Sequence, residues 1–174
     1  MVYNASATTV NAITIYRNTL YIGLENGNIL VSTTGLTFTS PPILSGLPPI
    51  KSLISFGNLL WIGTSLDFDG NGYLYKYNGT SISRKSFGEY QVLSLGKTSK
   101  YMFIGLGSST AGSKKGLIWY TNGITYTPIY NTLQDRVDVI EYNTGTSELW
   151  AGTSDGSIYA FTFKTDGSVN AISR

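Results

Sequence analysis

The stretch Leu60-Trp61-Ile62-Gly63 decides the fold, because close variants of it occur four times in this chain. The glycines that end the four copies are 40, 42 and 47 residues apart. A period of this size indicates a repeat architecture, in which one small unit of secondary structure is copied along the chain. The other three copies are Leu20-Tyr21-Ile22-Gly23, Met102-Phe103-Ile104-Gly105 and Leu149-Trp150-Ala151-Gly152.

The sequence around each copy predicts three further strands. An apolar stretch comes before it, at residues 10–16, 50–56, 91–95 and 137–142. A second glycine follows and begins another apolar stretch, at Gly27, Gly72, Gly116 and Gly156. A turn then closes the unit, at Thr34-Gly35, Asn78-Gly79, Asn122-Gly123 and Asp166-Gly167. Glycine provides the positive φ that tight hairpin turns require, so each unit is predicted to be four short antiparallel strands.

Four strands in about 40 residues is the size of one β-propeller blade. The central strands are apolar on both faces, as expected where each blade packs between two neighbours. Residues 60–64 with 72–78, and residues 149–161, resemble the blade repeat of two-component-regulator-type propellers and, more loosely, that of quinoprotein propellers. We therefore predict an all-β chain, a small β-propeller of four four-stranded antiparallel blades.

The predicted blades cover approximately residues 8–49, 50–90, 91–135 and 136–174 of a single domain, 1–174. Residues 1–9 are a candidate closing segment, because Val2-Tyr3-Asn4 resembles Ile129-Tyr130-Asn131. Closure of four blades within one chain is the simplest arrangement. A row of four blades that stayed open would expose two apolar faces, which two chains could cover by forming an eight-bladed ring. A chain cut from a longer array is the other alternative.

The composition excludes several classes of function. The 174 residues include no cysteine and no histidine, and 13% are charged, with a net charge of +2. Disulfides, thiolate chemistry and histidine-dependent catalysis are therefore excluded within this chain, and any metal has to be held by oxygen ligands. No apolar run is long enough to span a membrane, and the lysines form no continuous basic track for nucleic acid.

Two long loops form the candidate ligand-binding surface. The connections between the second and third strands are short in blades 1 and 4 but expanded at residues 65–71 and 107–115. Function in propellers tends to lie on the face with the longer loops, although surface loops also lengthen at little cost in stability. The predicted contact residues are Asp67, Phe68, Asp69, Asn71, Ser108, Ser109, Lys114 and Lys115.

The first of these loops also contains a candidate calcium site. Residues 67–72 match the pattern D-x-D-x-N-G, in which alternate oxygen side chains can surround one cation. The predicted ligands are Asp67, Asp69, the Asn71 side chain and the Tyr73 carbonyl. The twelfth position is Asn78 instead of glutamate, so the loop is not an EF-hand. It is closer to the integrin-type propeller loop, although Tyr75 stands where that loop has an acidic residue. The alternative is a hairpin tip in which these residues only form a turn.

Other polar and aromatic residues have simpler interpretations. Asn4 and Asn78 begin N-x-S/T sequons, which permit glycosylation if the protein is exported. The aromatic residue in each repeat, Tyr21, Trp61, Phe103 or Trp150, is predicted to pack between blades. Carboxylates that map near the long loops would suit sugar hydroxyls or, as a pair, the acid and base of a glycosidase.

We therefore predict a non-enzymatic recognition module that binds a glycan or a protein through its long loops, on a cell or virion surface. One alternative is a structural subunit of a larger assembly, with copies of the chain in contact. A carboxylate-based glycoside hydrolase is the third.

Overall fold

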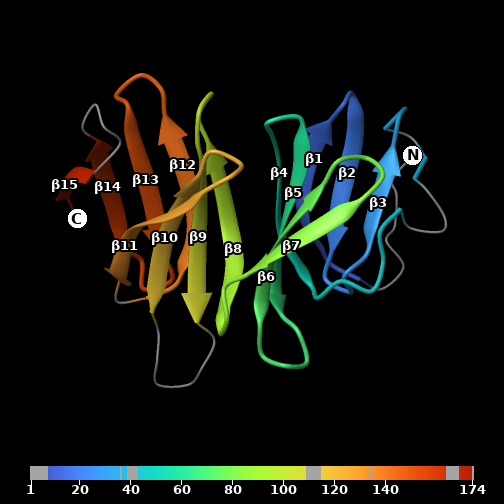
Figure 1. The fold of residues 1–174 in the computed structure, drawn as a ribbon, viewed down its shortest axis with the longest axis horizontal. Coiled ribbons are helices and arrows are strands. Elements are labelled where there is room, and N and C mark those ends of the chain that lie inside the picture. Colours follow the sequence, from blue (N-terminus) through green and yellow to red (C-terminus); the bar gives the residue numbers. More distant parts are fainter. Residues whose placement is uncertain are drawn as a thin grey trace. The chain divides into compact units, whose positions relative to one another are not determined.

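The computed structural model describes residues 8–35, 37–38, 43–108, 115–133, 135–163 and 169–173. The regular structure in these residues consists of β-strands, arranged in four antiparallel sheets (Figure 1). Within each sheet the strands lie side by side in the order of the sequence. The prediction of an all-β chain with four repeated units of short antiparallel strands is confirmed.

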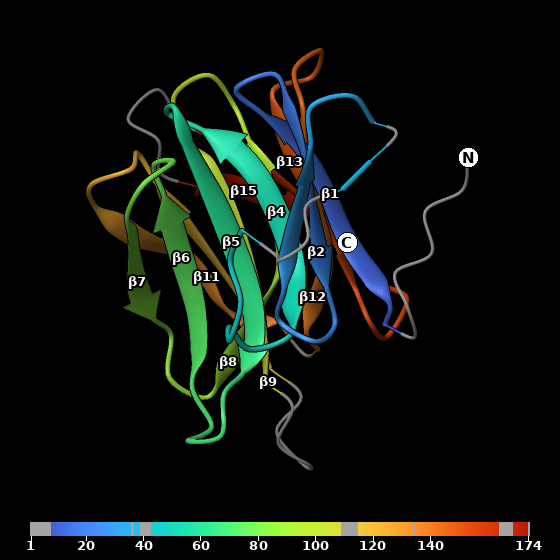
Figure 2. The ribbon, with the colours of Figure 1, turned by 90° about the vertical axis from the view of Figure 1, so that its right-hand side faces the viewer.

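The chain divides into two compact units, Met1–Val92 and Leu93–Arg174. Two sheets belong to the first unit, of which the second is seen well in Figure 2. Its strands are β1 (Val10–Tyr16), β2 (Thr19–Leu24) and β3 (Ile29–Ser32) in the first sheet, and β4 (Ile50–Phe56), β5 (Leu59–Leu66), β6 (Gly72–Tyr77) and β7 (Ile82–Ser86) in the second.

The third and fourth sheets belong to the second unit. The first strand of the third sheet, β8, begins at Tyr90, so its first residues are counted in the first unit. The strands of the third sheet are β8 (Tyr90–Lys97), β9 (Met102–Ser108), β10 (Gly116–Thr121) and β11 (Tyr126–Leu133). Those of the fourth are β12 (Val137–Asn143), β13 (Glu148–Thr153), β14 (Ile158–Phe163) and β15 (Val169–Ser173).

The first sheet has three strands in the described residues, one fewer than predicted. The expected turn is present, since Gly35 has a φ of +74° and donates its amide hydrogen to Ser32 Oγ at 2.8 Å. In the described residues, no fourth strand of this sheet follows the turn. The chain instead returns to Ile29, whose amide donates to the Leu44 carbonyl at 2.8 Å. The connection to the second sheet is rich in proline, which has no amide hydrogen for a ladder.

A β-bulge recurs at the start of the first, second and fourth sheets and shows that the sequence repeat is also a backbone repeat. The pairing register shifts between Val10 and Ala12, and equivalent shifts occur at residues 50–52 and 137–139. Beside each bulge, an amide near the end of the second strand donates to a carbonyl just before the first. These bonds are Glu25 N to Thr9 O (2.9 Å), Ser65 N to Pro49 O (2.9 Å) and Ser154 N to Arg136 O (3.2 Å).

The repeated glycine makes room for the next sheet. A β-carbon at Gly63 would lie 2.6 Å from Val92 Cγ1, and one at Gly105 would lie 2.8 Å from Val137 Cγ1. Gly23 is similarly covered by Ile50. A β-branched side chain of the following first strand therefore fills a slot over each of these glycines, and a larger residue would prevent this close approach.

Each unit has its own core of buried apolar side chains. In the first unit, tyrosines dominate it, and Tyr16 and Tyr21 meet edge to face with ring centroids 5.6 Å apart. In the second unit, Phe103 stacks on Tyr142 at 5.9 Å. The predicted packing position is buried at Tyr21, Trp61 and Phe103, but Trp150 is 43% exposed.

Candidate functional site

A groove of about 610 Å³ opens in the first unit. Three segments line it, and two side chains from the second sheet complete it. The segments are the β2–β3 turn at Glu25 and Asn26, the connection Gly46–Pro49, and Leu66, Asp67 and Phe68 at the start of the β5–β6 loop; the side chains are Tyr75 and Arg84.

The connection that forms one wall is fastened on both sides. It is tied to β3 by the bridge between Ile29 and Leu44, and to β5 by the bond from Ser65 N to Pro49 O. Gly27, with a φ of +79°, packs so closely on the connection that a β-carbon there would overlap the Leu47 carbonyl. Because Pro48 and Pro49 also fix their own φ angles, this wall is rigid.

The β5–β6 loop forms the opposite wall and is held by its own hydrogen bonds. Asp67 Oδ1 accepts the amide hydrogens of Asp69 at 3.0 Å and Asn71 at 2.9 Å. These bonds, that from Asn71 above all, lower the pKa of Asp67 against the opposing effect of desolvation. At the tip of this ordered loop the Phe68 side chain is fully exposed. A rigid loop therefore presents an aromatic ring at the mouth of the groove.

Arg84 is the cation of the groove and rests on tyrosine rings. Its guanidinium carbon lies 4.4 Å from the centroid of the Tyr73 ring, a cation–π distance. Hydrogen bonding to Tyr75, together with the charges nearby, raises the pKa of Arg84. Desolvation and a hydrogen bond to Asp67 raise the pKa of Tyr73. Arg84 lies on β7, whose residues are all exposed, so its charge is open to solvent and to a ligand.

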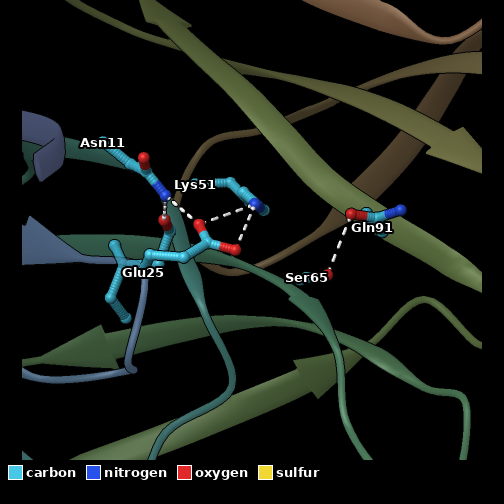
Figure 3. A network of polar contacts seen from close by, with 6 residues as sticks. Asn11, Glu25, Lys51, Ser65 and Gln91 are labelled. Atoms are coloured by element: carbon cyan, nitrogen blue, oxygen red, sulfur yellow. Dashed lines mark hydrogen bonds and ion pairs between the residues drawn. The ribbon is translucent and has the colours of Figure 1, made fainter. Parts of the chain in front are cut away.

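Glu25 is held in a polar network that joins β1, the β2–β3 turn and β4 (Figure 3). Lys51 Nζ lies 2.9 and 3.1 Å from the two carboxylate oxygens of Glu25, and Asn11 donates to the same carboxylate and to the Ile50 carbonyl. Desolvation alone would raise the pKa of Glu25, but the bonds from Lys51 and Asn11 and the charge of Lys51 lower it. Glu25 is therefore an ionised, anchored carboxylate.

Two of the predicted contact residues, Asp67 and Phe68, line the groove, whereas Asp69 and Asn71 lie farther along the same loop. The second predicted loop belongs to the second unit, where Lys115 is exposed just before β10. Ser108 was expected on that loop, but it is the last residue of β9 and is buried, because the strand continues to it. Ser109 and Lys114 lie outside the described residues.

The predicted calcium ligands are partly engaged in the loop itself. Asp67 Oδ1 already accepts two amide hydrogens, and the Tyr73 carbonyl accepts a bond from Thr64 Oγ1 at 3.2 Å. In the described part of the chain no three acidic side chains gather as a metal-binding group. These contacts are the ones expected if the loop residues only form a hairpin turn. Calcium binding stays a prediction from the sequence.

The two predicted glycosylation positions differ in what the structure describes. Asn78 is exposed in the β6–β7 turn, where its Oδ1 accepts the amide hydrogens of Thr80 and Ser81. Asn4 lies outside the described residues. Glycosylation at either residue stays a prediction.

Three parts of the groove were not predicted from the sequence: Arg84, Tyr75 and the Leu47–Pro49 wall. Arg84 lies in a short polar strand that resembles an ordinary solvated edge, and only the β6–β7 pairing, with Tyr75 opposite Arg84, brings it over the tyrosines. The prolines of the connection do not indicate in the sequence which loop the connection faces. A tyrosine at every second position of β6 was the available signal.

Comparison with known proteins identifies the fold. No family model matches the sequence, and no curated protein does. The computationally designed Ika4 protein matches with a TM-score of 0.64 and 14% identity, over 94% of this chain and 96% of its own. The fold is that of a β-propeller. This confirms the predicted fold class, while the type of blade repeat rests on the sequence resemblance.

Two natural propellers also match, and both are longer than this chain. YCF48, solved bound to D1 peptide, has a TM-score of 0.62 and 17% identity, over 99% of this chain and 55% of its own. The extracellular domain of a putative one-component system from B. thetaiotaomicron has a TM-score of 0.64 and 17% identity, over 93% of this chain and 23% of its own. This chain thus spans about half of the first of these propellers and a quarter of the second.

The described residues contain no helix with the length and apolar character needed to cross a membrane.

Proposed function

We propose that this propeller is a non-enzymatic binding module that holds a segment of a partner protein in the groove of its first unit. The observation that carries the proposal is Phe68, a fully exposed aromatic side chain at the mouth of a groove with fixed walls. An isolated solvated phenylalanine gains nothing for stability, whereas aromatic residues are typical anchors of binding surfaces.

The chemistry of the lining defines the ligand. Leu47, Pro48 and Pro49 offer apolar contacts, and Arg84 offers a planar cation to a carboxylate. The ligand is therefore an extended segment with an apolar side chain for the groove and an acidic group for Arg84. The fixed walls lower the entropic cost of binding such a segment.

A glycan is the second candidate, because Phe68 could stack on a sugar ring beside the Asp67 carboxylate. Sugar hydroxyls also need free oxygen acceptors. Glu25 is paired with Lys51, and one oxygen of Asp67 accepts two amide hydrogens, so much of that capacity is already used. This favours a protein ligand over a glycan.

The same carboxylates support a non-enzymatic role. A glycosidase needs one carboxylic acid whose raised pKa keeps it protonated until it donates to the leaving group. The two carboxylates that line the groove, Glu25 and Asp67, both have a lowered pKa. They are suited to holding the walls in place.

The neighbours in fold agree with a binding role, since YCF48 was solved with a bound peptide. One neighbour is an extracellular domain, which supports the proposal of a protein exposed on a cell or virion surface. The four copies of the segment Leu60–Gly63 further support a blade repeat of the two-component-regulator type.

The test is a selection on the immobilised full chain, against a random peptide display library and a glycan array. We expect peptides to be enriched on the wild type and lost on the variant Phe68→Ala/Arg84→Ala. The control Ile124→Ala removes a side chain that is 84% exposed in a turn of the second unit, and it should keep them. Enrichment of glycans alone supports the second candidate, and enrichment that survives the double substitution places the site elsewhere.

A further inference from the structure

The first sheet ends in the edge strand β3 and the second sheet ends in the edge strand β7 (Figure 2 for β7). The edge of β3 is covered by the chain itself. Ile29 accepts the amide hydrogen of Ile43 at 3.0 Å and donates its own to the Leu44 carbonyl at 2.8 Å. In the described residues, no strand or isolated bridge pairs with the edge of β7 that faces away from β6.

Hydrogen bonds fix the ladder between β6 and β7 at both of its ends. Gly72 accepts the amide hydrogen of Phe87 at 2.9 Å and donates its own to the Gly88 carbonyl at 2.7 Å. At the other end, Asn78 donates its amide hydrogen to the Ser81 carbonyl at 3.2 Å. In an antiparallel ladder, pairs that exchange hydrogen bonds alternate with pairs that do not. Counting inward from either end gives the same alternation.

This alternation determines which backbone groups of β7 face its open edge. Ser83 and Lys85 fall in hydrogen-bonded pairs, so their backbone groups point toward β6. The residues on either side of them fall in the other kind of pair, and their N–H and C=O groups point away from β6. These residues are Ile82, Arg84 and Ser86. Every residue of β7 is exposed, so the strand offers a row of backbone donors and acceptors.

The open edge of β7 borders the groove. Arg84 is paired with Tyr75 in the ladder, so the two side chains lie on the same face of the sheet, and both line the groove. A segment that lies along the open edge directs every second side chain to this face. Those side chains come next to the Arg84 guanidinium and the groove.

The charge of β7 indicates which kind of strand can pair with it. The strand carries the neighbouring cations Arg84 and Lys85 and no carboxylate. Cations on an open edge repel another strand of the same charge, which protects a protein from edge-to-edge aggregation. They attract a strand with acidic side chains. Protection against aggregation alone is the alternative role of these cations.

We propose that the ligand is an acidic, extended segment that adds to the open edge of β7 as a further strand. This inference rests on the proposed binding role of the groove and specifies how the segment is held. Its backbone pairs with Ile82, Arg84 and Ser86, and an acidic side chain meets the Arg84 guanidinium. In such strand addition the backbone bonds supply affinity, and the groove selects the side chains.

The first test replaces single backbone amides of a peptide selected on the wild type by N-methyl amides. Only every second residue of an added strand directs its backbone groups to β7. N-methylation should therefore weaken binding about tenfold or more at alternate positions and much less at the positions between. Calorimetry with each peptide measures the dissociation constants.

The outcomes separate this inference from the proposed function. A peptide that depends on Phe68 but tolerates every N-methyl group, or loses affinity without alternation, overturns the strand addition alone. The binding role of the groove then stands, and the cations of β7 only protect the edge. Failure to select any peptide overturns the proposed function and the strand addition with it.

The second test changes the edge of β7 itself. Ser86→Pro removes an amide hydrogen that points to the open edge, where proline is tolerated in strands. Ser86→Ala keeps this amide and removes only the hydroxyl, which accepts the amide hydrogen of Gly88 at 3.1 Å. Ser86→Pro should bind the selected peptide about tenfold more weakly than Ser86→Ala. Thermal melts establish that both variants are folded, and equal affinities overturn the inference.

The third test is amide hydrogen exchange of the wild-type chain, followed by NMR, and it does not depend on a variant. Without peptide, the amides of Ile82, Arg84 and Ser86 should exchange faster than those of Ser83 and Lys85. With the selected peptide they should become protected. Protection of these amides in the free chain shows that the edge is already covered and overturns the inference. Exchange that the peptide leaves unchanged overturns it as well.

Discussion

Gly27 and Gly156 occupy the same place in two β-hairpin turns, with φ angles of +79° and +84°. They differ in their surroundings, because Gly27 packs on the Leu47 carbonyl, whereas no atom beyond the glycine and its two chain neighbours lies within 4 Å of a β-carbon at Gly156. Gly156→Ala should cost about 1–2 kcal/mol of the free energy of unfolding, from the left-handed backbone alone. Gly27→Ala should cost clearly more, because the connection also has to move. Urea denaturation of both variants compares them, and equal losses would refute the docking of the connection on Gly27.

The Tyr126 hydroxyl makes the free energy of unfolding depend on pH in the alkaline range. Burial raises the pKa of Tyr126 from 10.0 to about 12, so the unfolded chain releases this proton at lower pH than the folded chain. The stability from the neutral hydroxyl is fully present below pH 10 and is lost as the pH rises toward 12. Tyr126→Phe should therefore lose less stability than the wild type between about pH 9 and pH 11.5, by about 1 kcal/mol. Thermal melts across this range measure the difference, and parallel curves would contradict it.

The β5–β6 loop illustrates how one side chain shapes an element. Asp67 accepts two amide hydrogens of the loop, whereas Asp69 is exposed two residues later. Asp67→Ala should lower the melting temperature of the protein, and Asp69→Ala should leave it nearly unchanged. The lowered pKa of Asp67 means that its contribution is present above the ordinary carboxyl pKa and is lost as the pH falls through its folded value.

Calcium chloride added to the same melts tests the sequence-based calcium prediction. If the loop binds calcium, the wild type melts at a higher temperature with the ion present, and both substitutions remove the increase. If these residues only form a turn, calcium changes none of the three melting temperatures.

The strands that pack on both faces could be predicted, because four apolar segments ending in glycine recur at matching positions. The missing fourth strand of the first sheet could not, since its turn residues Thr34-Gly35 are typical of a hairpin, as in the other sheets. Only the bridge from Leu44 to Ile29 shows that the chain returns along a different path. A turn motif indicates where a strand ends, and tertiary contacts determine the path of the chain beyond that turn.

At the scale of the whole molecule, the repeat predicts which positions are buried if every blade has two neighbours. Trp61 and Phe103 follow this rule and Trp150 does not, because burial at that position depends on the sheet that comes next. The groove itself was not predicted, although two of its lining residues lie on a loop that the sequence singled out. Asp67 and Phe68 could be located from the length of their loop, whereas Arg84 required the pairing of β6 with β7.

The central claim is that the groove beside Phe68 is where this propeller binds its ligand. The most direct test is the dissociation constant, measured by calorimetry, of a peptide selected on the wild type. We predict that Phe68→Ala weakens binding at least about tenfold, as expected for an aromatic anchor, and that Ile124→Ala leaves it unchanged. A Phe68→Ala variant that binds as tightly as the wild type would contradict the claim.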